Sequence, residues 1–297
     1  MNTLTALSQD LPQDLPWDQG QAVLLLDGAA VPDLPLRLAA CAPGILKIPL
    51  YKETRFNALS DISPLLVAIG QPDDPAFQFY LEHAAQEWGS LLFTREPLNR
   101  LTKHLRKLLT VNVAEGPEVM LRLADPAVAH ALIGAQGLDE RLFGPIHTWV
   151  IPDRVTGGWH RHTRTLTTPA DLPKRYELSV EQNAALDAVD LRRATLKLDA
   201  HLQAYFPDDR VRPLPERWPA LDRQVRTAYA QGFTSQSDLT YYANIFAWLG
   251  SSPLEQHPQI ARLLSTPSAQ TPSARIAAAA QLASAWALAH SADKDRP

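Results

Sequence analysis

The pattern of apolar residues changes once along this 297-residue chain, and that change limits what the chain can fold into. From Gln21 to about Arg164, apolar runs of strand length end at Gly, Pro or Asp and alternate with segments of helical spacing. After about Pro173, helical spacing continues to the end of the chain. We therefore expect two lobes of different secondary structure, and an apolar content of 45% is enough for a core in each.

The first lobe should be of the α/β type. Its expected strands are short apolar runs bounded by turn residues: 22–28, 45–51, 64–70, 90–95 and 118–124. Between two of them, Leu98, Leu101 and Leu105 form the apolar face of a helix. Strands that alternate with helices favour a mixed or mostly parallel sheet with flanking helices. The runs 146–151 and 159–165, on either side of a Gly-containing turn, predict a hairpin.

The second lobe should be all-helical. Ser179 and Gln182 have the spacing of a capping box, and the helix after them should end at Pro207. Two further helices, 220–232 and 237–250, each end at a glycine, and an alanine-rich helix follows near the C-terminus. The expected domains are an N-terminal extension (1–20), an α/β domain (21–170) and a helical lobe (171–297).

Charge and cysteine content narrow the function classes. Twenty-eight basic and thirty-two acidic residues give a net charge of −4, which offers no overall field for nucleic acid or an anionic membrane. A single cysteine, Cys41, rules out an internal disulfide and suits a reducing compartment. The N-terminus lacks the basic and apolar regions of a signal peptide, and the apolar segment 276–289 is shorter than a membrane span of roughly 20 residues. We expect a cytoplasmic protein.

Motifs for cofactor or nucleophile chemistry are missing from the sequence. Neither a P-loop nor a dinucleotide fingerprint follows any expected strand, so no nucleotide cofactor is expected. No Gly-x-Ser-x-Gly motif occurs, and Cys41 lies in an alanine-rich helix where a small core residue is a better interpretation than a nucleophile. Asp27 ends the first expected strand, where α/β enzymes often place a carboxylate, but Asp-Gly is also an ordinary turn.

Two clusters of polar residues could bind something other than a small substrate. His160 and His162 should share one strand face, with His147 on the partner strand, so that three imidazoles could meet at a metal; Arg161 and Arg164 argue instead for an exposed basic hairpin without metal. In the helix 97–109, one face carries Arg100, Lys103 and Lys107 opposite the leucines. This face is either simply solvated or a site for an acidic partner surface.

The segment 118–133 combines a charge with a break in structure. Arg122 stands among apolar residues of an expected strand, and a buried unpaired charge is costly by several kcal/mol. A carboxylate should therefore pair with it, and Asp125, Asp27 and Asp61 are the candidates. Asp125-Pro126 also has the pattern of a helix N-cap followed by proline in the first turn. We interpret Asp27, Arg122 and Asp125 as a structural polar core, with recognition as a secondary role.

At these residues the sequence resembles the type VI secretion adaptor chaperones, a family whose genes commonly lie between a VgrG spike gene and a toxic effector gene. The matching segments occur in the family's order: LLLDGA (24–29), PLY with SPLLVAI (49–69), LRLADP (121–126), LFGPIHTW (142–149) and the tail YAQGFTSQSDLTYYANIFAWLG (229–250). Departures are Ser63, where the family usually has glycine, the lack of an aromatic near Leu123 or Ala124, and Ala127, where it often has arginine. These departures concern local packing.

The resemblance implies a non-catalytic protein that binds an effector in the producing cell and delivers it to its cognate VgrG, with no nucleic acid or membrane partner. Trp149, Trp159, Tyr241 and Tyr242 are then candidate anchors for a partner, although large aromatic side chains more often pack in a core. Two rival hypotheses remain. One is a small-molecule enzyme with a polar site at Asp27, Arg122 and Asp125, and the other is a nucleic-acid-binding module that uses the basic helix and hairpin.

Overall fold

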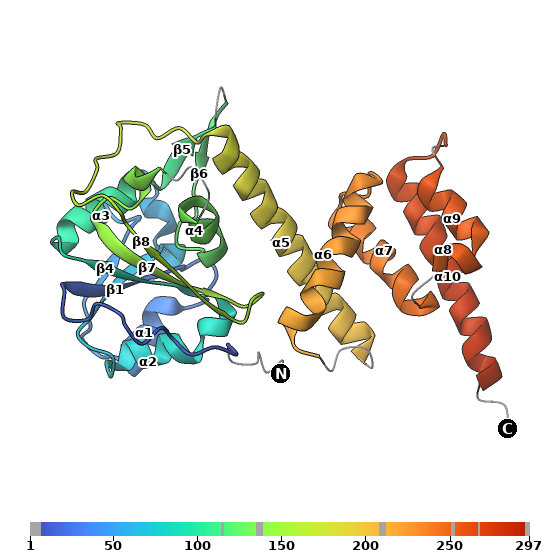
Figure 1. Cartoon of the computed structure of the whole chain (residues 1–297), viewed down its shortest axis with the longest axis horizontal. Helices are drawn as coiled ribbons and strands as arrows, with labels where there is room; N and C mark the ends of the chain where they lie inside the picture. The colour runs from blue at the N-terminus through green and yellow to red at the C-terminus, as the bar shows by residue number, and fades with distance from the viewer. Residues whose placement is uncertain are drawn as a thin grey trace. The chain divides into compact units, whose positions relative to one another are not determined.

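A six-stranded antiparallel sheet lies at the centre of the first half of the chain (Figure 1). Its strands are β1 (Gln21–Leu26), β2 (Lys47–Pro49), β3 (Leu65–Ile69), β4 (Gly89–Thr94), β7 (Ile146–Asp153) and β8 (Gly158–Thr163). They are arranged in the order β2-β3-β1-β4-β7-β8. In the register of the central strands, Leu24 of β1 lies opposite Val67 of β3 and Leu91 of β4.

The computed structural model describes residues 7–113, 116–134, 139–207, 212–250, 253–266 and 268–294. Contacts between residues divide the chain into two compact units, 1–189 and 190–297. The division falls inside a long helix, whereas the domain limit expected from the sequence lies at residue 170.

The expected α/β lobe with flanking helices is confirmed, but its sheet is not mixed or mostly parallel, because every strand pair is antiparallel. The helical crossovers from β1 to β2 and from β3 to β4 do join strands of the same direction, as such connections normally do. However, the connection from β1 to β2 skips β3, and the connection from β3 to β4 skips β1. Each parallel pair is thus separated by one antiparallel strand, as in a split βαβ unit.

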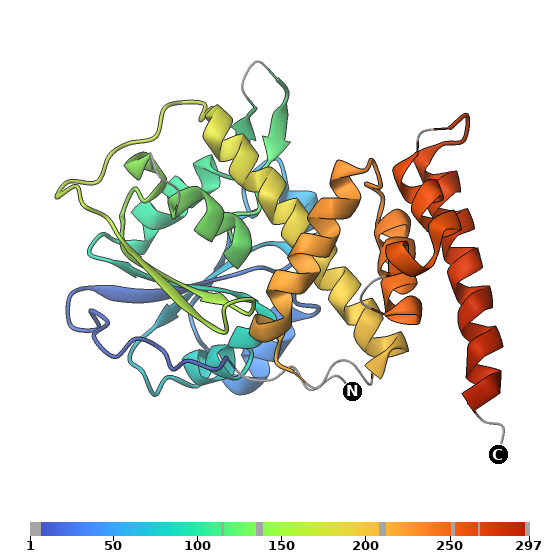
Figure 2. The same cartoon turned by 45° about the vertical axis from the view of Figure 1, so that its right-hand side comes forward.

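Helices cover both faces of this sheet, which explains why its strands are continuously apolar (Figures 1 and 2). The helices are α1 (Leu34–Cys41), α2 (Pro75–Glu82), α3 (Leu98–Lys107) and α4 (Pro126–Ile133). On one face, Val23 and Trp149 pack in a core with leucines of α3 and α4. On the other, Leu24 and Val150 pack with residues of α1 and α2.

Short elements complete the first unit. They are β5 (Thr110–Asn112), β6 (Glu118–Met120), η1 (Asn57–Ile62), η2 (Ala84–Gln86) and η3 (Glu140–Leu142). Strand β6 pairs with β5 in a small separate sheet and ends at Met120, earlier than the expected strand end at residue 124. The reason is a turn in which the Asp125 amide donates to the Arg122 carbonyl (2.9 Å). That turn starts α4.

The predicted hairpin is confirmed as β7–β8, and the segment before β1 packs against the same unit. Leu15 is buried, and the Trp17 ring contacts Phe77 and Phe93 edge-on. The Gln9 amide donates to the Gly157 carbonyl in the hairpin turn (3.0 Å). The described part of the expected N-terminal extension therefore belongs to the core of the first unit, while residues 1–6 lie outside the described residues.

The rest of the chain is helical, as predicted (Figure 2). The helices are α5 (Val180–Tyr205), α6 (Leu214–Ala230), α7 (Gln236–Leu249), α8 (Pro253–Gln256), α9 (Pro258–Ser265) and α10 (Pro272–Lys294). The capping box at the start of α5 is confirmed, since the Ser179 amide donates to Gln182 Oε1 (2.9 Å) and the Gln182 amide to Ser179 Oγ (3.2 Å). Among the described residues, no helix combines the length and apolar character needed to cross a membrane.

One buried ion pair stands out in the second unit. Arg217 of α6 donates from Nε to Asp199 Oδ1 (2.9 Å) and from Nη2 to Asp199 Oδ2 (2.6 Å). Both side chains are largely shielded from solvent, with exposed fractions of 10% and 4%. The arginine also donates to the Arg212 carbonyl (2.6 Å). This bidentate contact joins α5 to α6 beside the apolar core of the unit.

Candidate functional site

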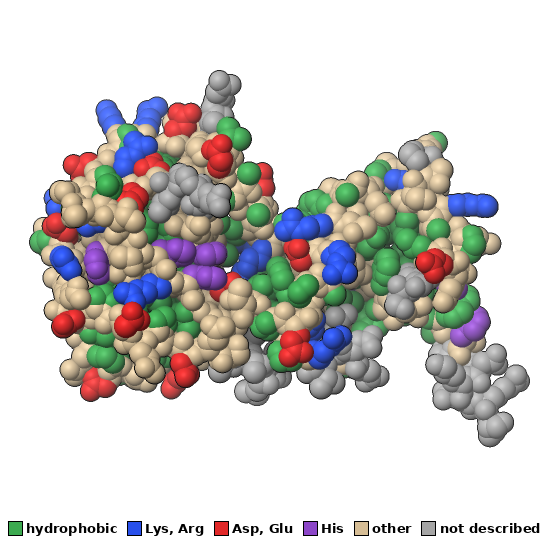
Figure 3. All heavy atoms as spheres, viewed as in Figure 1, with side chains coloured by type: hydrophobic (Ala, Val, Ile, Leu, Met, Phe, Trp, Pro, Cys, Tyr) green, Lys and Arg blue, Asp and Glu red, His purple; other side chains and the backbone are tan. Residues whose placement is uncertain are grey.

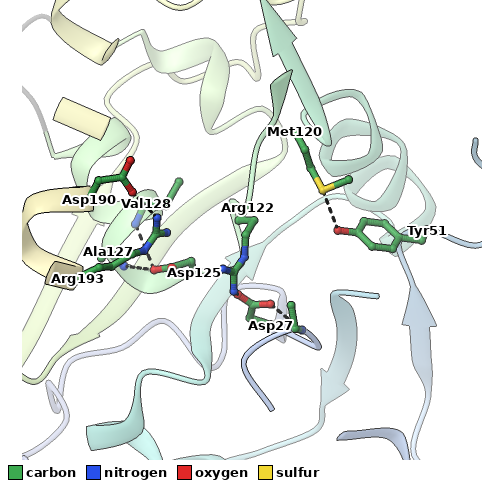
Figure 4. Close-up of polar contacts among 10 residues, drawn as sticks. Asp27, Tyr51, Met120, Arg122, Asp125, Ala127, Val128, Asp190 and Arg193 are labelled. Carbon is green, nitrogen blue, oxygen red and sulfur yellow. Dashed lines mark hydrogen bonds and ion pairs between the residues drawn. The ribbon is translucent and has the colours of Figure 1, made fainter. Parts of the chain in front are cut away.

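Asp27 and Arg122 form an ion pair at the end of β1 (Figure 4). Arg122 Nη2 lies 2.6 Å from Asp27 Oδ2, and the other carboxylate oxygen accepts a hydrogen bond from the Ala29 amide (2.9 Å). The Asp27 side chain is only 3% exposed. Both of its oxygens therefore have partners within the fold, so that the carboxylate fixes the turn after β1 to the segment before α4.

Arg122 does not lie where the sequence predicted. It belongs to the turn that follows β6, and its side chain is 42% exposed rather than buried in a strand. Of the three carboxylates considered, Asp27 is the one that contacts it. Because its side chain is partly exposed, the residue is both a structural partner of Asp27 and part of the surface.

Three segments that resemble the family motifs pack together around this ion pair. A Cβ atom on Gly28 would lie 2.2 Å from the Ser63 carbonyl oxygen, so only glycine fits between β1 and the segment before β3. Ser63 Oγ accepts a hydrogen bond from the Tyr51 amide (3.0 Å). Burial, and then the Asp27 carboxylate, raise the pKa of the Tyr51 hydroxyl, which contacts the Met120 sulfur (3.6 Å). Three of the family-like segments, 24–29, 49–69 and 121–126, thus meet at one place.

Asp125 has a separate structural role. Its Oδ1 accepts hydrogen bonds from the Ala127 amide (2.9 Å) and the Val128 amide (3.4 Å) at the start of α4 (Figure 4). The predicted N-cap, with Pro126 in the first turn, is confirmed. The expected polar core is therefore an Asp27–Arg122 pair and a helix cap at Asp125.

Replacing Asp27 should test the structural role of this pair. We expect Asp27→Ala to lower the free energy of unfolding by about 2–3 kcal/mol, because it removes a buried acceptor and the partner of Arg122. Asp27→Asn keeps an acceptor for the Ala29 amide and should cost less. Chemical denaturation measures both variants. Equal and negligible losses would show that the pair does not stabilise the fold.

A positively charged pocket lies beside α3. This cationic pocket has a volume of about 200 Å³ and is lined by Arg100, Lys103, His104 and Lys107, by Gly144 and Pro145, and by residues 169–172. His104, which also lines the pocket, is buried, and its Nε2 lies 2.9 Å from the Leu142 carbonyl oxygen. Burial, together with the charge of Lys107, lowers the pKa of His104. The lining therefore combines a buried imidazole whose neutral form is favoured with a charged rim of Arg100, Lys103 and Lys107.

Three residues singled out from the sequence form that rim. Arg100 pairs with Glu96 (2.9 Å), while Lys103 and Lys107 are exposed and have no ion pair or hydrogen bond within the described chain. His104, which the sequence places beside this cationic face, is buried. Gly144 has a positive φ of 48°, and a Cβ there would lie 2.2 Å from the His104 ring. None of Asp27, Arg122 and Asp125 lines the pocket.

Histidines gather on the surface of the first unit (Figure 3, purple). The His130 ring of α4 stacks on the His160 ring (centroids 3.9 Å apart), and His130 Nδ1 lies 3.0 Å from His162 Nε2. His160 Nε2 contacts Asp153 Oδ2 (3.0 Å). His130, which sequence reasoning missed, thus joins His160 and His162 in place of the expected His147. No group of three potential ligands within the described residues is arranged to hold a metal ion.

The histidine cluster should make stability depend on pH. Burial, with a smaller effect of His160, lowers the pKa of His162 to about 4. Since the unfolded chain binds this proton more readily, stability should fall as the pH drops from about 6.5 to about 4. The partly exposed ring limits the effect to about 1–2 kcal/mol. The denaturation midpoint should depend less on pH in His162→Gln than in the unmodified protein. An unchanged dependence would contradict this assignment.

The aromatic candidates have different positions. Trp149 is fully buried, with Nε1 donating to Ser90 Oγ (2.7 Å), and Tyr242 is buried between Phe233 and Phe246. The prediction that Trp149 and Tyr242 are surface anchors was wrong, because each side chain packs in a core. Trp159 is half-buried against Tyr80, and Tyr241 is 40% exposed. Cys41 is half-buried at the end of α1, where burial raises the pKa of its thiol and so disfavours the nucleophilic thiolate.

By fold and surface, this is a protein with an antiparallel α/β unit, a helical unit and a cationic pocket. A fold of this kind does not by itself define a function. Residues 23–141 match a family described as "Domain of unknown function (DUF4123)". The chain is also 31% identical to "Accessory protein VasW" of Vibrio cholerae serotype O1, in an alignment of 272 residues that covers 89% of this chain and 88% of the relative.

The chain belongs to the type VI secretion adaptor family. The match to the Vibrio cholerae protein extends well beyond residues 23–141, so the similarity includes most of the helical unit. No solved structure matches the chain. The family resemblance inferred from the ordered motifs is confirmed, and a type VI secretion accessory role follows from it.

Proposed function

We propose that this protein is a non-catalytic adaptor that binds a toxic type VI secretion effector in the cytoplasm and loads it onto its cognate VgrG spike protein. The observation that carries the proposal is the similarity to an accessory protein over 89% of the chain. An adaptor needs separate contacts for its cargo and for its destination, and a chain with two compact units offers more than one surface for them.

The arrangement of the polar side chains supports binding over chemistry. Asp27 uses both carboxylate oxygens inside the fold, and Asp125 caps a helix. Lys103 and Lys107, which have no ion pair or hydrogen bond among the described residues, instead line a pocket of the first unit. The small-molecule enzyme hypothesis required Asp27, Arg122 and Asp125 to converge on one cavity, and nothing in their contacts favours that arrangement.

Co-expression tests the proposal. The tagged protein should retain the product of the neighbouring effector gene on an affinity column, and the VgrG encoded with it should join the complex when added. The matched control is an unrelated effector with its own VgrG, expressed at the same level. Failure to retain either cognate product, with a correctly folded adaptor, would contradict the proposal.

A further inference from the structure

We infer that the cationic pocket binds a carboxylate-bearing side chain from an acidic segment of a protein partner. This inference rests on the proposed adaptor function and specifies the chemistry of one contact. The pocket is formed within the first unit, by the outer face of α3, the Gly144–Pro145 turn and the segment 169–172.

The charge around the pocket is not balanced within the described chain. Lys103 and Lys107 stand one helical turn apart with no acceptor there, and Arg100 has only Glu96. Behind the pocket, Arg164 Nη1 donates to the Gly144 carbonyl (2.5 Å), while its buried Nε has no hydrogen-bond partner in the structure. Burial lowers the pKa of Arg164; Glu140 and Glu96 oppose this effect, and the charges of Arg100 and Arg95 add to it. An incoming carboxylate would supply the acceptor that Lys103 and Lys107 lack among the described residues.

The volume of the pocket suits a single side chain of a partner better than a small-molecule metabolite. Pockets for small molecules typically enclose roughly 300–1,000 Å³. This one has about 200 Å³, which suits one anchoring side chain of a larger partner. Leu172 and Pro145 provide an apolar surface for the methylene groups of a glutamate, and the buried His104 also lines the pocket. The carboxylate would then lie between Lys103 and Lys107.

The lining favours an acidic peptide over nucleic acid. Asp171 lines the pocket and Glu96 pairs with Arg100 at its rim, so a continuous row of phosphates would meet repulsion there. Bases bind single-strand sites by stacking on exposed aromatic rings, and the only ring with aromatic character in the lining is the buried His104. A segment with spaced carboxylates avoids both problems.

A peptide-binding measurement tests the inference directly. The probe is a fluorescein-labelled peptide of alternating Glu and Gly, compared with the same peptide carrying Gln for Glu. Fluorescence anisotropy with the full-length protein should show binding of the Glu peptide alone. Binding should weaken by at least about tenfold in Lys103→Glu/Lys107→Glu, and also when salt rises from about 50 to about 300 mM.

The matched control is Lys52→Glu/Lys197→Glu, which reverses two exposed lysines away from the pocket and should bind the peptide as the unmodified protein does. Lys103→Ala/Lys107→Ala replaces the first variant if circular dichroism shows that charge reversal perturbs the fold.

Equal binding by pocket and control variants, or binding of a single-stranded oligonucleotide in place of the peptide, would overturn the inference. If the unmodified protein does not bind the Glu peptide and the pocket variant still retains the effector, the inference fails and the adaptor function stands. If the unmodified protein retains no effector, the adaptor function itself fails.

Discussion

Replacing Trp149 by alanine should lower the free energy of unfolding of the first unit by about 3–5 kcal/mol. The indole is fully buried in the sheet core, where it contacts Phe143 edge-on, and its Nε1 donates to Ser90 Oγ (2.7 Å). Removing it leaves a cavity and an unpartnered hydroxyl. Guanidinium denaturation followed by near-ultraviolet circular dichroism measures the loss.

Trp149→Phe is the matched control. It retains most of the buried ring and loses only the hydrogen bond to Ser90, so we expect a cost of about 1–2 kcal/mol. Partner binding by folded Trp149→Phe should be unchanged, since the side chain is inaccessible. A Trp149→Ala variant of full stability that no longer binds its partner would restore Trp149 as an anchor and contradict its place in the core.

Replacing Asp199 by alanine should destabilise the helical unit by about 3–5 kcal/mol, because Arg217 would be left as a buried charge without its carboxylate. Gln203 would also lose the acceptor of its side-chain amide (2.7 Å). Far-ultraviolet circular dichroism, recorded during chemical denaturation, should show that the helical signal of the variant is lost at a lower denaturant concentration.

The double variant Asp199→Leu/Arg217→Met is the control for this pair. Removing both charges avoids an unpaired ion, and apolar replacement of a buried pair is often neutral or stabilising. We therefore expect the double variant to regain most of the lost stability. If it were less stable than Asp199→Ala, the cost would come from lost packing or from the Arg212 contact instead of from the unpaired charge.

Features set by neighbouring residues were predictable from the sequence. The caps at Asp125 and Ser179 depend on spacings of two or three residues, and both have the predicted hydrogen bonds. The β7–β8 hairpin is equally local. Strand direction in the sheet was not predictable in this way, because a crossover that skips a strand has the same local pattern as one that does not. The apolar runs that favoured parallel pairing arise because helices cover both sheet faces.

The candidate site was predictable in part for the same reason. The alternatives for Arg122 included Asp27, but its exposure depends on where β6 ends, which is set by the turn to Asp125. The cations of α3 were visible as a helix face, whereas the pocket beside them needs Gly144 and residues 169–172, which are distant in sequence. His130 carried no signal, since a lone histidine in an apolar helix is usually structural. The sequence could not show which aromatic candidates are buried in a core and which are exposed, because burial depends on the packing of distant segments.

A titration of the adaptor tests the central claim most directly. Effector and cognate VgrG are held at fixed concentrations, and the amount of effector captured on immobilised VgrG is measured as this protein is added. A non-catalytic adaptor should increase capture in proportion to its own amount, reach a plateau at a fixed molar ratio to effector, and remain in the complex. Full capture at a small fraction of that ratio, or capture that is independent of the protein, would contradict the account.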